Sequence, residues 1–250
     1  MDGLVCISCV MSAHEPKAPY GREVYEPGEN LPIELPESPF AIFQQWFDDA
    51  KKAQRQPNPN AMCVSSVDSE GRPSGRIVLC RGIDADPGHV VFYTNYESRK
   101  GKELLEQRVC AATFHWDHFD RQVRLEGEVV KSPMDESDHY FSRRRWESQL
   151  GAWASDQSEP IGSRQAMLDK VAKKMDEMGL DLDSIVHGDE KAPEIARPPH
   201  WGGFRLYPRR VELWCGDTGR IHDRALWTRE MTREGDDFSF GSWSATRLQP

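Results

Sequence analysis

Short apolar runs separated by turn-forming residues are the feature that most constrains the fold of this chain. The turn between the first two runs, Asp-Ser-Glu-Gly-Arg-Pro at residues 68–73, has the composition of a β-hairpin loop. Strands joined by hairpins favour an antiparallel sheet over alternating βαβ units. The sequence therefore predicts a mainly β fold with peripheral helices around a β-barrel. The predicted strands occupy residues 61–67, 76–81, 90–94, 110–116, 122–131, 203–207, 210–215, 225–228 and 238–244.

Helical spacing of apolar residues fills the gaps between these strands. The predicted helices occupy residues 39–53, 98–106, 135–145 and 164–178. Residues 1–38 are rich in Pro and Glu and are expected to form an extended, partly disordered N-terminal arm. Residues 39–250 are expected to form a single domain, with a polar loop at residues 180–199.

The composition favours a soluble, cytoplasmic protein. Hydrophobic residues make up 38% of the 250 residues, and no run approaches the roughly 18 apolar residues of a membrane-spanning helix. The six cysteines are scattered, and Cys6-Ile-Ser-Cys9 is a lone CxxC without a partner pair. No metal site is therefore expected.

The formal net charge of −9 is unevenly distributed. Residues 1–50 hold nine acidic and two basic side chains, so the rest of the chain is close to neutral. An acidic protein is a poor nucleic-acid binder. The cations of the neutral part are bunched at residues 99–102, 121–124, 143–145 and 220–224. Such clusters suit small anions, although each could also be a group of solvated surface arginines.

One strand–loop–helix unit carries the residues that a phosphate monoester requires. A buried-looking strand has Arg76 at one end and Arg81 at the other. The next strand ends in Tyr93 and Thr94, and a helix then begins with Ser98, Arg99 and Lys100. Cations, hydroxyls and a helix start directed to one point form an anion site.

Together with residues 121–127 and with Arg-Ile-His-Asp-Arg at residues 220–224, this unit resembles the pyridoxamine 5'-phosphate oxidases. The resemblance covers about residues 20–250. It implies an FMN-binding split barrel that forms a homodimer, with active sites built across the interface. It also implies FMN-dependent oxidation of pyridoxamine or pyridoxine 5'-phosphate to pyridoxal 5'-phosphate, with O₂ reduced to H₂O₂.

The same resemblance implies a set of flavin-binding residues. They are Arg76, Ile77, Val78, Leu79, Tyr93, Thr94, Arg99, Lys100, Gln122, Gln157, Ser158, Trp214 and Arg224. Trp214 could also be a plain core residue of its apolar strand, but the Arg-Ile-His-Asp-Arg segment that follows favours the flavin site.

The substrate-binding residues implied are Arg22, Glu23, Val24, Tyr25, Arg81, Tyr140, Arg144, Ser148, Arg220, Ile221 and His222. Tyr140, Arg144 and Ser148 are spaced by four, so one helix would present all three on one face. Arg220 and His222, the implied catalytic pair, are spaced by two, so a strand would direct both to one ligand.

Two departures from the family pattern bear on the substrate. Arg81 stands where the family usually has a lysine, and Arg145 replaces a usual proline. Both leave open a same-fold oxidase of another aromatic substrate, as in phenazine-type pathways. A non-catalytic flavin- or vitamer-binding protein is the other alternative, but it would be expected to lack Arg220 or His222.

Overall fold

The computed structural model describes residues 30–180 and 193–250, and antiparallel strands dominate it. The strands are β1 (Ala61–Val67), β2 (Pro73–Asp84), β3 (His89–Asn95), β4 (Val109–Trp116), β5 (Arg121–Lys131), β6 (Trp201–Cys215), β7 (Asp223–Thr228), β8 (Met231–Glu234), β9 (Asp237–Phe240) and β10 (Ser244–Leu248). The helices are α2 (Phe40–Ala53), α3 (Arg99–Gln107), α4 (Met134–Ser142), α5 (Trp146–Ala154) and α6 (Arg164–Glu177), with 3₁₀ turns at Asp117–Phe119 and Thr218–Arg220.

Six strands close into an antiparallel barrel, which confirms the predicted fold class. The strand order is β6-β3-β2-β1-β4-β5, and β5 pairs again with β6 to close the ring. β7 and β10 extend the sheet from the C-terminal half of β6, and β8 and β9 form a separate hairpin. Closure leaves the barrel strands without free edges.

β6 is one continuous strand, so the prediction of separate strands at residues 203–207 and 210–215 is wrong. The two halves are joined through Pro208, which lies opposite Gly127 at a shift in the β5–β6 register. Proline has no N–H for the ladder and is accommodated at such irregularities. A Cβ on Gly127 would lie 2.0 Å from the Tyr207 carbonyl oxygen, so only glycine fits there. The strand predicted at residues 238–244 is likewise replaced by β9 and β10.

Aromatic side chains pack α2 against the barrel. Phe43 and Phe47 of α2 contact Phe114 of β4, with ring centroids 5.1 and 6.1 Å apart. Both phenylalanines are buried, as is Trp116 beside them. Burying such large side chains supplies most of the favourable free energy of folding.

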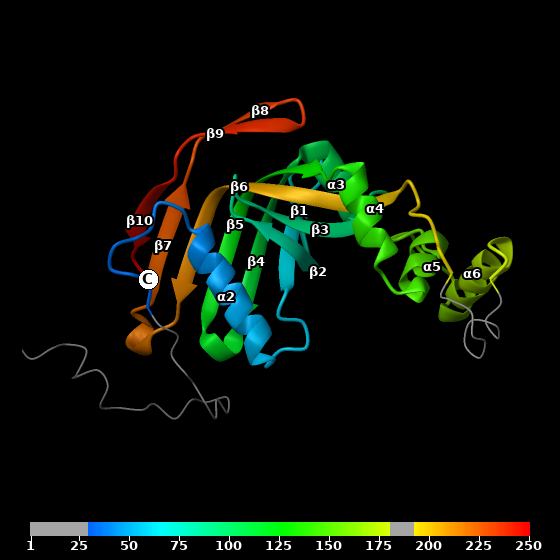
Figure 1. The fold of residues 1–250 in the computed structure, drawn as a ribbon, viewed down its shortest axis with the longest axis horizontal. Coiled ribbons are helices and arrows are strands. Elements are labelled where there is room, and N and C mark those ends of the chain that lie inside the picture. Colours follow the sequence, from blue (N-terminus) through cyan, green and yellow to red (C-terminus); the bar gives the residue numbers. More distant parts are fainter. Residues whose placement is uncertain (1–29, 181–192) are drawn as a thin grey trace, which may run out of the picture.

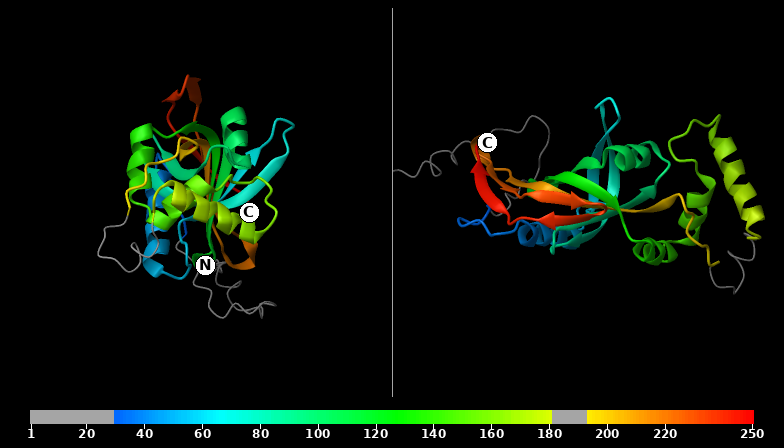
Figure 2. Two further views of the ribbon diagram at one scale, coloured as in Figure 1. Left: turned by 90° about the vertical axis from the view of Figure 1, so that its right-hand side faces the viewer. Right: turned by 90° about the horizontal axis from the view of Figure 1, so that it is seen from above.

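The molecule is elongated, with the C-terminal strands and the later helices at opposite ends. β7 and β10 lie on one side of the barrel, whereas α4, α5 and α6 lie on the other (Figures 1 and 2). The segment before α2 is attached to the C-terminal strands, because Leu31 N–H donates to Asp223 (2.9 Å) and the Trp227 indole donates to Pro36 O (2.9 Å). Within the described residues, the helices are too short or too polar to cross a bilayer.

Candidate functional site

A cavity of about 290 Å³ brings together ten of the residues that the sequence predicts for the site. They come from β2, β3, α3, α4 and the turns after α4 and α5. The lining consists of Ile77, Val78, Leu79, Arg81, Tyr93, Thr94, Lys100, Tyr140, Arg144, Gln157 and Trp201. Residues implied for the flavin and for the substrate therefore face one space.

One wall of the cavity is aromatic. The ring of Tyr93 stacks on Tyr140 with centroids 4.0 Å apart and planes 7° apart, and Trp201 lies parallel to both. Trp201, the first residue of β6, was not predicted as a site residue; its only signal in the sequence is a large aromatic at the start of an apolar run. Parallel rings form a rigid flat wall, which suits a planar ligand.

Two guanidinium groups lie against this wall. Arg144 lies over the Trp201 ring, 4.6 Å from its centroid, and Arg81 lies 5.6 Å from the centre of Tyr140. Nη1 of Arg144 is buried and has no hydrogen-bond partner among the described residues. Burial lowers the pKa of Arg144, and the nearby charge of Arg81 lowers it further. A buried donor without a partner is costly, so an anion at this point would be strongly favoured.

The cavity lining also contains a third cation, Lys100. Its Nζ donates to Gln157 Oε1 (2.7 Å), Thr94 Oγ1 (3.0 Å) and Ser98 Oγ (3.3 Å). Burial, followed by repulsion from Arg76, lowers the pKa of Lys100 to about 8.

Ser98 caps α3, and the helix can begin so close to β3 only because position 101 is glycine. The Ser98 hydroxyl accepts from Gly101 N–H at 3.2 Å. A Cβ on Gly101 would lie 2.3 Å from the Tyr96 carbonyl oxygen. The N-terminus of a helix favours a bound anion.

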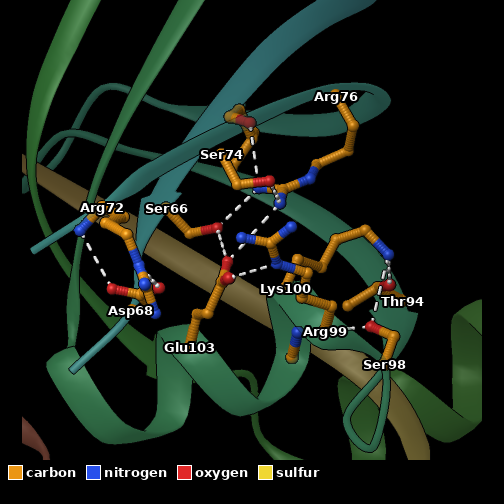
Figure 3. A network of polar contacts seen from close by, with 12 residues as sticks. Ser66, Asp68, Arg72, Ser74, Arg76, Thr94, Ser98, Arg99, Lys100 and Glu103 are labelled. Carbon is orange, nitrogen blue, oxygen red and sulfur yellow. Dashed lines mark hydrogen bonds and ion pairs between the residues drawn. The ribbon is translucent and has the colours of Figure 1, made fainter. Parts of the chain in front are cut away.

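Arg76 and Arg99, also predicted for the flavin phosphate, meet at Glu103 of α3 (Figure 3). Arg99 Nε donates to Glu103 Oε1 at 2.8 Å, and Arg76 Nη2 lies 3.5 Å from Oε2. Ser66 donates to the same carboxylate and accepts from Arg76 at 2.6 Å. Burial raises the pKa of Glu103, but the bonds from Ser66 and Arg99 and the two arginine charges outweigh it and hold the pKa below its usual value.

Glu103 was not predicted as a site residue, although its place four residues after Arg99 is the spacing of a helical ion pair. The chemistry of the residues around Lys100 and Glu103 fits the phosphate of FMN, and Thr94 and Lys100 among them line the cavity. Arg76, Arg99 and Lys100 supply cations, and Thr94 and Ser98 supply hydroxyls.

Glu136 of α4 is a further residue that the sequence did not reveal. It accepts from the Tyr93 hydroxyl (3.2 Å) and from Nε of Arg205 (2.9 Å). Burial, with Glu136 next, raises the pKa of the Tyr93 phenol, so the phenol stays protonated and donates. This hydrogen bond holds the Tyr93 ring in its stack with Tyr140.

A second group of predicted residues lies around the far end of β6. Gln122 of β5 pairs with Trp214 of β6, and Trp214 pairs with Arg224 of β7, so the three lie in a row across the sheet. Arg224 donates to the buried Glu212 (2.7 Å) and to Gln249 O (2.9 Å). Trp214 is half-buried and is therefore not a plain core residue.

The implied catalytic pair belongs to this second group, but not on a strand. Thr218–Arg220 is a 3₁₀ turn with positive φ at Gly219 and Arg220, and β7 starts only at Asp223. The predicted strand alternation is therefore wrong, and Ile221 is 53% exposed. His222 lies against Trp214 (4.6 Å between centroids), and its Nδ1 accepts from Asp217 N–H (3.2 Å), so Nε2 carries the proton of the neutral ring.

The two groups lie at opposite ends of β6 and do not line a common cavity in the described part of the chain. Tyr93 is paired with Gly203 and Gln122 with Trp214, at opposite ends of β6. The strand path between these points is roughly 36 Å at about 3.3 Å per residue.

Three other predictions have a different outcome. Ser148 is exposed on α5, because the chain leaves the helical conformation between Ser142 and Trp146; the prediction of one helix face for Tyr140, Arg144 and Ser148 is wrong. Ser158 is exposed and lines a separate cavity with Arg99 and Glu103. Residues Arg22, Glu23, Val24 and Tyr25 lie outside the described residues.

Comparison with known proteins agrees with this arrangement. Residues 47–174 match the family described as pyridoxamine 5'-phosphate oxidase. Residues 201–250 match the pyridoxine 5'-phosphate oxidase C-terminal dimerisation region, which supports a homodimer.

Among solved structures, PhzG from Burkholderia lata, in complex with tetrahydrophenazine-1-carboxylic acid, has a TM-score of 0.69 and 26% identity over 89% of this chain and 100% of its own. A pyridoxamine 5'-phosphate oxidase-related, FMN binding protein from Nostoc punctiforme has a TM-score of 0.62 at 14% identity over 87% of this chain and all of its own, which supports the fold alone.

Curated relatives are more similar in sequence. The pyridoxine/pyridoxamine 5'-phosphate oxidase of Paraburkholderia phytofirmans is 42% identical over 92% of this chain and 97% of its own length. The enzyme of the same name from Burkholderia mallei is 45% identical over 85% of this chain and 89% of its own. The chain therefore belongs to the pyridoxine/pyridoxamine 5'-phosphate oxidase family and is an oxidoreductase.

Proposed function

We propose that this chain is an FMN-dependent oxidase that converts pyridoxamine and pyridoxine 5'-phosphates to pyridoxal 5'-phosphate, with O₂ reduced to H₂O₂. The observation that carries the proposal is a single cavity whose lining includes three cations, Arg81, Lys100 and Arg144. Lys100 bonds to Thr94 and Gln157 and is repelled by Arg76, whereas Arg81 and Arg144 lie against the aromatic rings. Two separate cationic points suit two phosphorylated ligands, one the cofactor and the other the substrate.

The residues of the chain have distinct tasks in this scheme. Lys100, Arg76 and Arg99 would hold the FMN phosphate, and Tyr140, Arg144 and Arg81 would hold the substrate phosphate. When bound, FMN would supply the hydride acceptor and the site of O₂ reduction. Arg220 and His222 would orient the reacting end of the substrate, a positioning effect that can lower the barrier by several kcal/mol.

The second group of residues would come from a second copy of the chain. Gln122, Trp214 and Arg224, with Arg220 and His222, lie roughly 36 Å along β6 from the cavity, at about 3.3 Å per residue. A homodimer could place this group of one protomer beside the cavity of the other. In this arrangement both protomers contribute residues to each FMN site, so we propose that FMN binding depends on dimer formation.

Spectroscopy and turnover test the proposal directly. The purified protein should release about one FMN per chain on denaturation. Pyridoxamine 5'-phosphate in air should then yield pyridoxal 5'-phosphate and an equal amount of H₂O₂. A protein that neither contains nor binds FMN would refute the flavin assignment, and a flavoprotein that is inert to both phosphates would refute the substrate assignment.

Mixed dimers test the shared site. Lys100→Met disables the cavity group, and Arg224→Met disables the second group, so both homodimers should be inactive. If the site crosses the interface, one site of each mixed dimer contains only unaltered groups, and about half the activity per dimer returns. If each site lies within one chain, every site carries a lesion and no activity returns.

A second candidate is oxidation of a reduced phenazine carboxylic acid, favoured by the similarity to PhzG. It would keep the flavin and change the substrate. Comparing kcat/KM for pyridoxamine 5'-phosphate with that for a reduced tricyclic carboxylic acid decides between the two. We also propose a cytoplasmic location, which rests on the sequence alone.

A further inference from the structure

Glu103 is a buried acidic residue in a site whose proposed ligand is an anion. Its side chain is only 7% exposed. It contacts Ser66 from β1, Arg76 from β2 and Arg99 from its own helix, so it joins three elements (Figure 3). A carboxylate this close would repel a phosphate, so its presence needs an explanation.

The contacts of Glu103 hold the two arginines in place. The Arg99 side chain is 59% exposed, and in the described part of the chain Glu103 is its only polar side-chain partner. Long cationic side chains lose considerable rotamer freedom when they are fixed. Arg76 is less exposed, at 19%, and also contacts Ser66 and Ser74. Without the carboxylate, Arg76, Arg99 and Lys100 would repel one another, and Arg99 is free to turn into solvent.

The charge count of the four groups is informative. Arg76, Arg99 and Lys100 contribute three positive charges, and Glu103 contributes one negative charge. Their net charge of +2 nearly balances the charge of a phosphate monoester, which is about −1.5 to −2 at pH 7.

We propose that Glu103 is a positioning residue of the flavin phosphate site, which orients Arg76 and Arg99 and matches the charge of the site to a phosphate dianion. The inference rests on the proposed FMN binding, and it assigns a task to a residue that does not itself touch the cofactor.

Lys100 gives the proposal a pH signature. The charged groups that act on its Nζ are Arg76, which lowers its pKa, and Glu103, which raises it; Thr94, Ser98 and Gln157 are neutral. In the free protein Lys100 loses its proton near pH 8, whereas a bound phosphate would raise that pKa. FMN affinity is then fully present below pH 8 and falls by up to about tenfold per pH unit above it. Removing the Glu103 charge moves the start of this fall to lower pH.

The experiment compares Glu103→Gln with wild type and with Glu106→Gln, a matched control on the exposed side of the same helix. Dissociation constants of FMN and of riboflavin, which lacks the phosphate, are measured on the apoprotein from pH 6.5 to 9.5. For Glu103→Gln we expect the FMN constant to rise about tenfold or more at pH 7, because oriented charge-assisted bonds are lost. The riboflavin dissociation constant of Glu103→Gln should equal that of wild type. Its FMN affinity should begin to fall at a lower pH than that of wild type. Glu106→Gln should match wild type, and Glu103→Asp, which keeps the charge, should recover part of the loss.

Two results would overturn the proposal. In the first, Glu103→Gln binds FMN as tightly as wild type with the same pH profile. In the second, the dissociation constants of FMN and riboflavin rise by the same factor, which would mean that Glu103 only stabilises the fold. If Glu103→Gln does not fold, Ser66→Ala takes its place. This variant removes the hydroxyl that bonds to both Glu103 and Arg76 and keeps every charge. The Ser66→Ala variant should raise the dissociation constant of FMN several-fold and leave that of riboflavin unchanged. An FMN dissociation constant equal to that of wild type would overturn the proposal. A wild-type protein that does not bind FMN would instead refute the proposed function.

Discussion

Replacing Arg144 with alanine is expected to weaken substrate binding without weakening the fold. The guanidinium is half-buried and lies over Trp201, with Nη1 lacking a partner among the described residues. A charge-assisted bond to a phosphate contributes about 1.5–3 kcal/mol, so KM should rise by about tenfold to about a hundredfold. Flavin content should stay the same, because in the proposed scheme Arg144 binds the substrate and not FMN.

The expected change in stability follows from two opposing effects. The substitution removes a cation–π contact, which is worth about 0.5–2 kcal/mol. It also removes a buried donor without a partner, which costs the free protein about 1–3 kcal/mol. The two nearly cancel, so the Tm should change by no more than about 4 °C.

Steady-state kinetics with pyridoxamine 5'-phosphate and a thermal melt measure both effects. Arg143→Ala is the matched control, because Arg143 is the exposed neighbour of Arg144. If the KM of Arg144→Ala equals that of Arg143→Ala, the Arg144 guanidinium does not bind the substrate. If the Tm falls by more than about 8 °C, the group stabilises the fold and the cancellation is wrong.

Three further predictions concern other parts of the site. Tyr93→Phe removes the bond to Glu136 that holds the ring in its stack with Tyr140, and it should raise KM a few-fold, measured by steady-state kinetics. Gly101→Ala places a Cβ 2.3 Å from a backbone oxygen, so the start of α3 must shift; a melt should show a Tm lower by several degrees, and an unchanged Tm would contradict this. Arg224→Ala leaves Glu212 with Arg124 alone and should cause flavin loss on gel filtration, whereas full retention would exclude Arg224 from the cofactor site.

The barrel could be predicted from the sequence because its signals are local. Hairpin turns and apolar runs fall within a few residues of one another, and the first five predicted runs each became a barrel strand within a few residues of the predicted bounds. The single strand β6 could not be predicted, because Pro208 normally interrupts a strand. Only its pairing with Gly127 in β5 accommodates it.

The break between α4 and α5 was missed for a related reason. Residues 134–154 show no Pro or Gly at the break, so spacing alone suggests that the helix continues. In the structure, Gln149 Nε2 donates to the carbonyl oxygen of Phe141 at 2.8 Å. This buried bond satisfies one of the carbonyl groups that a helix end leaves without a partner. The partner lies in the next helix, and a local pattern does not contain it.

Three glutamates were missed in part because each also pairs with an arginine that is remote in sequence. Glu103 pairs with an arginine 27 residues away, Glu136 with one 69 residues away and Glu212 with one 88 residues away. A search along the sequence finds the arginines as clusters of cations and counts their full charge. In the folded chain Glu103 contacts Arg76 and Arg99, and Glu212 contacts Arg124 and Arg224; each carboxylate fixes the guanidinium direction and lowers the local net charge. The net charge at the ligand site therefore depends on which carboxylates the fold brings next to the arginines. The same ion pairs orient the guanidinium groups, and this orientation determines whether they can bond to a phosphate dianion.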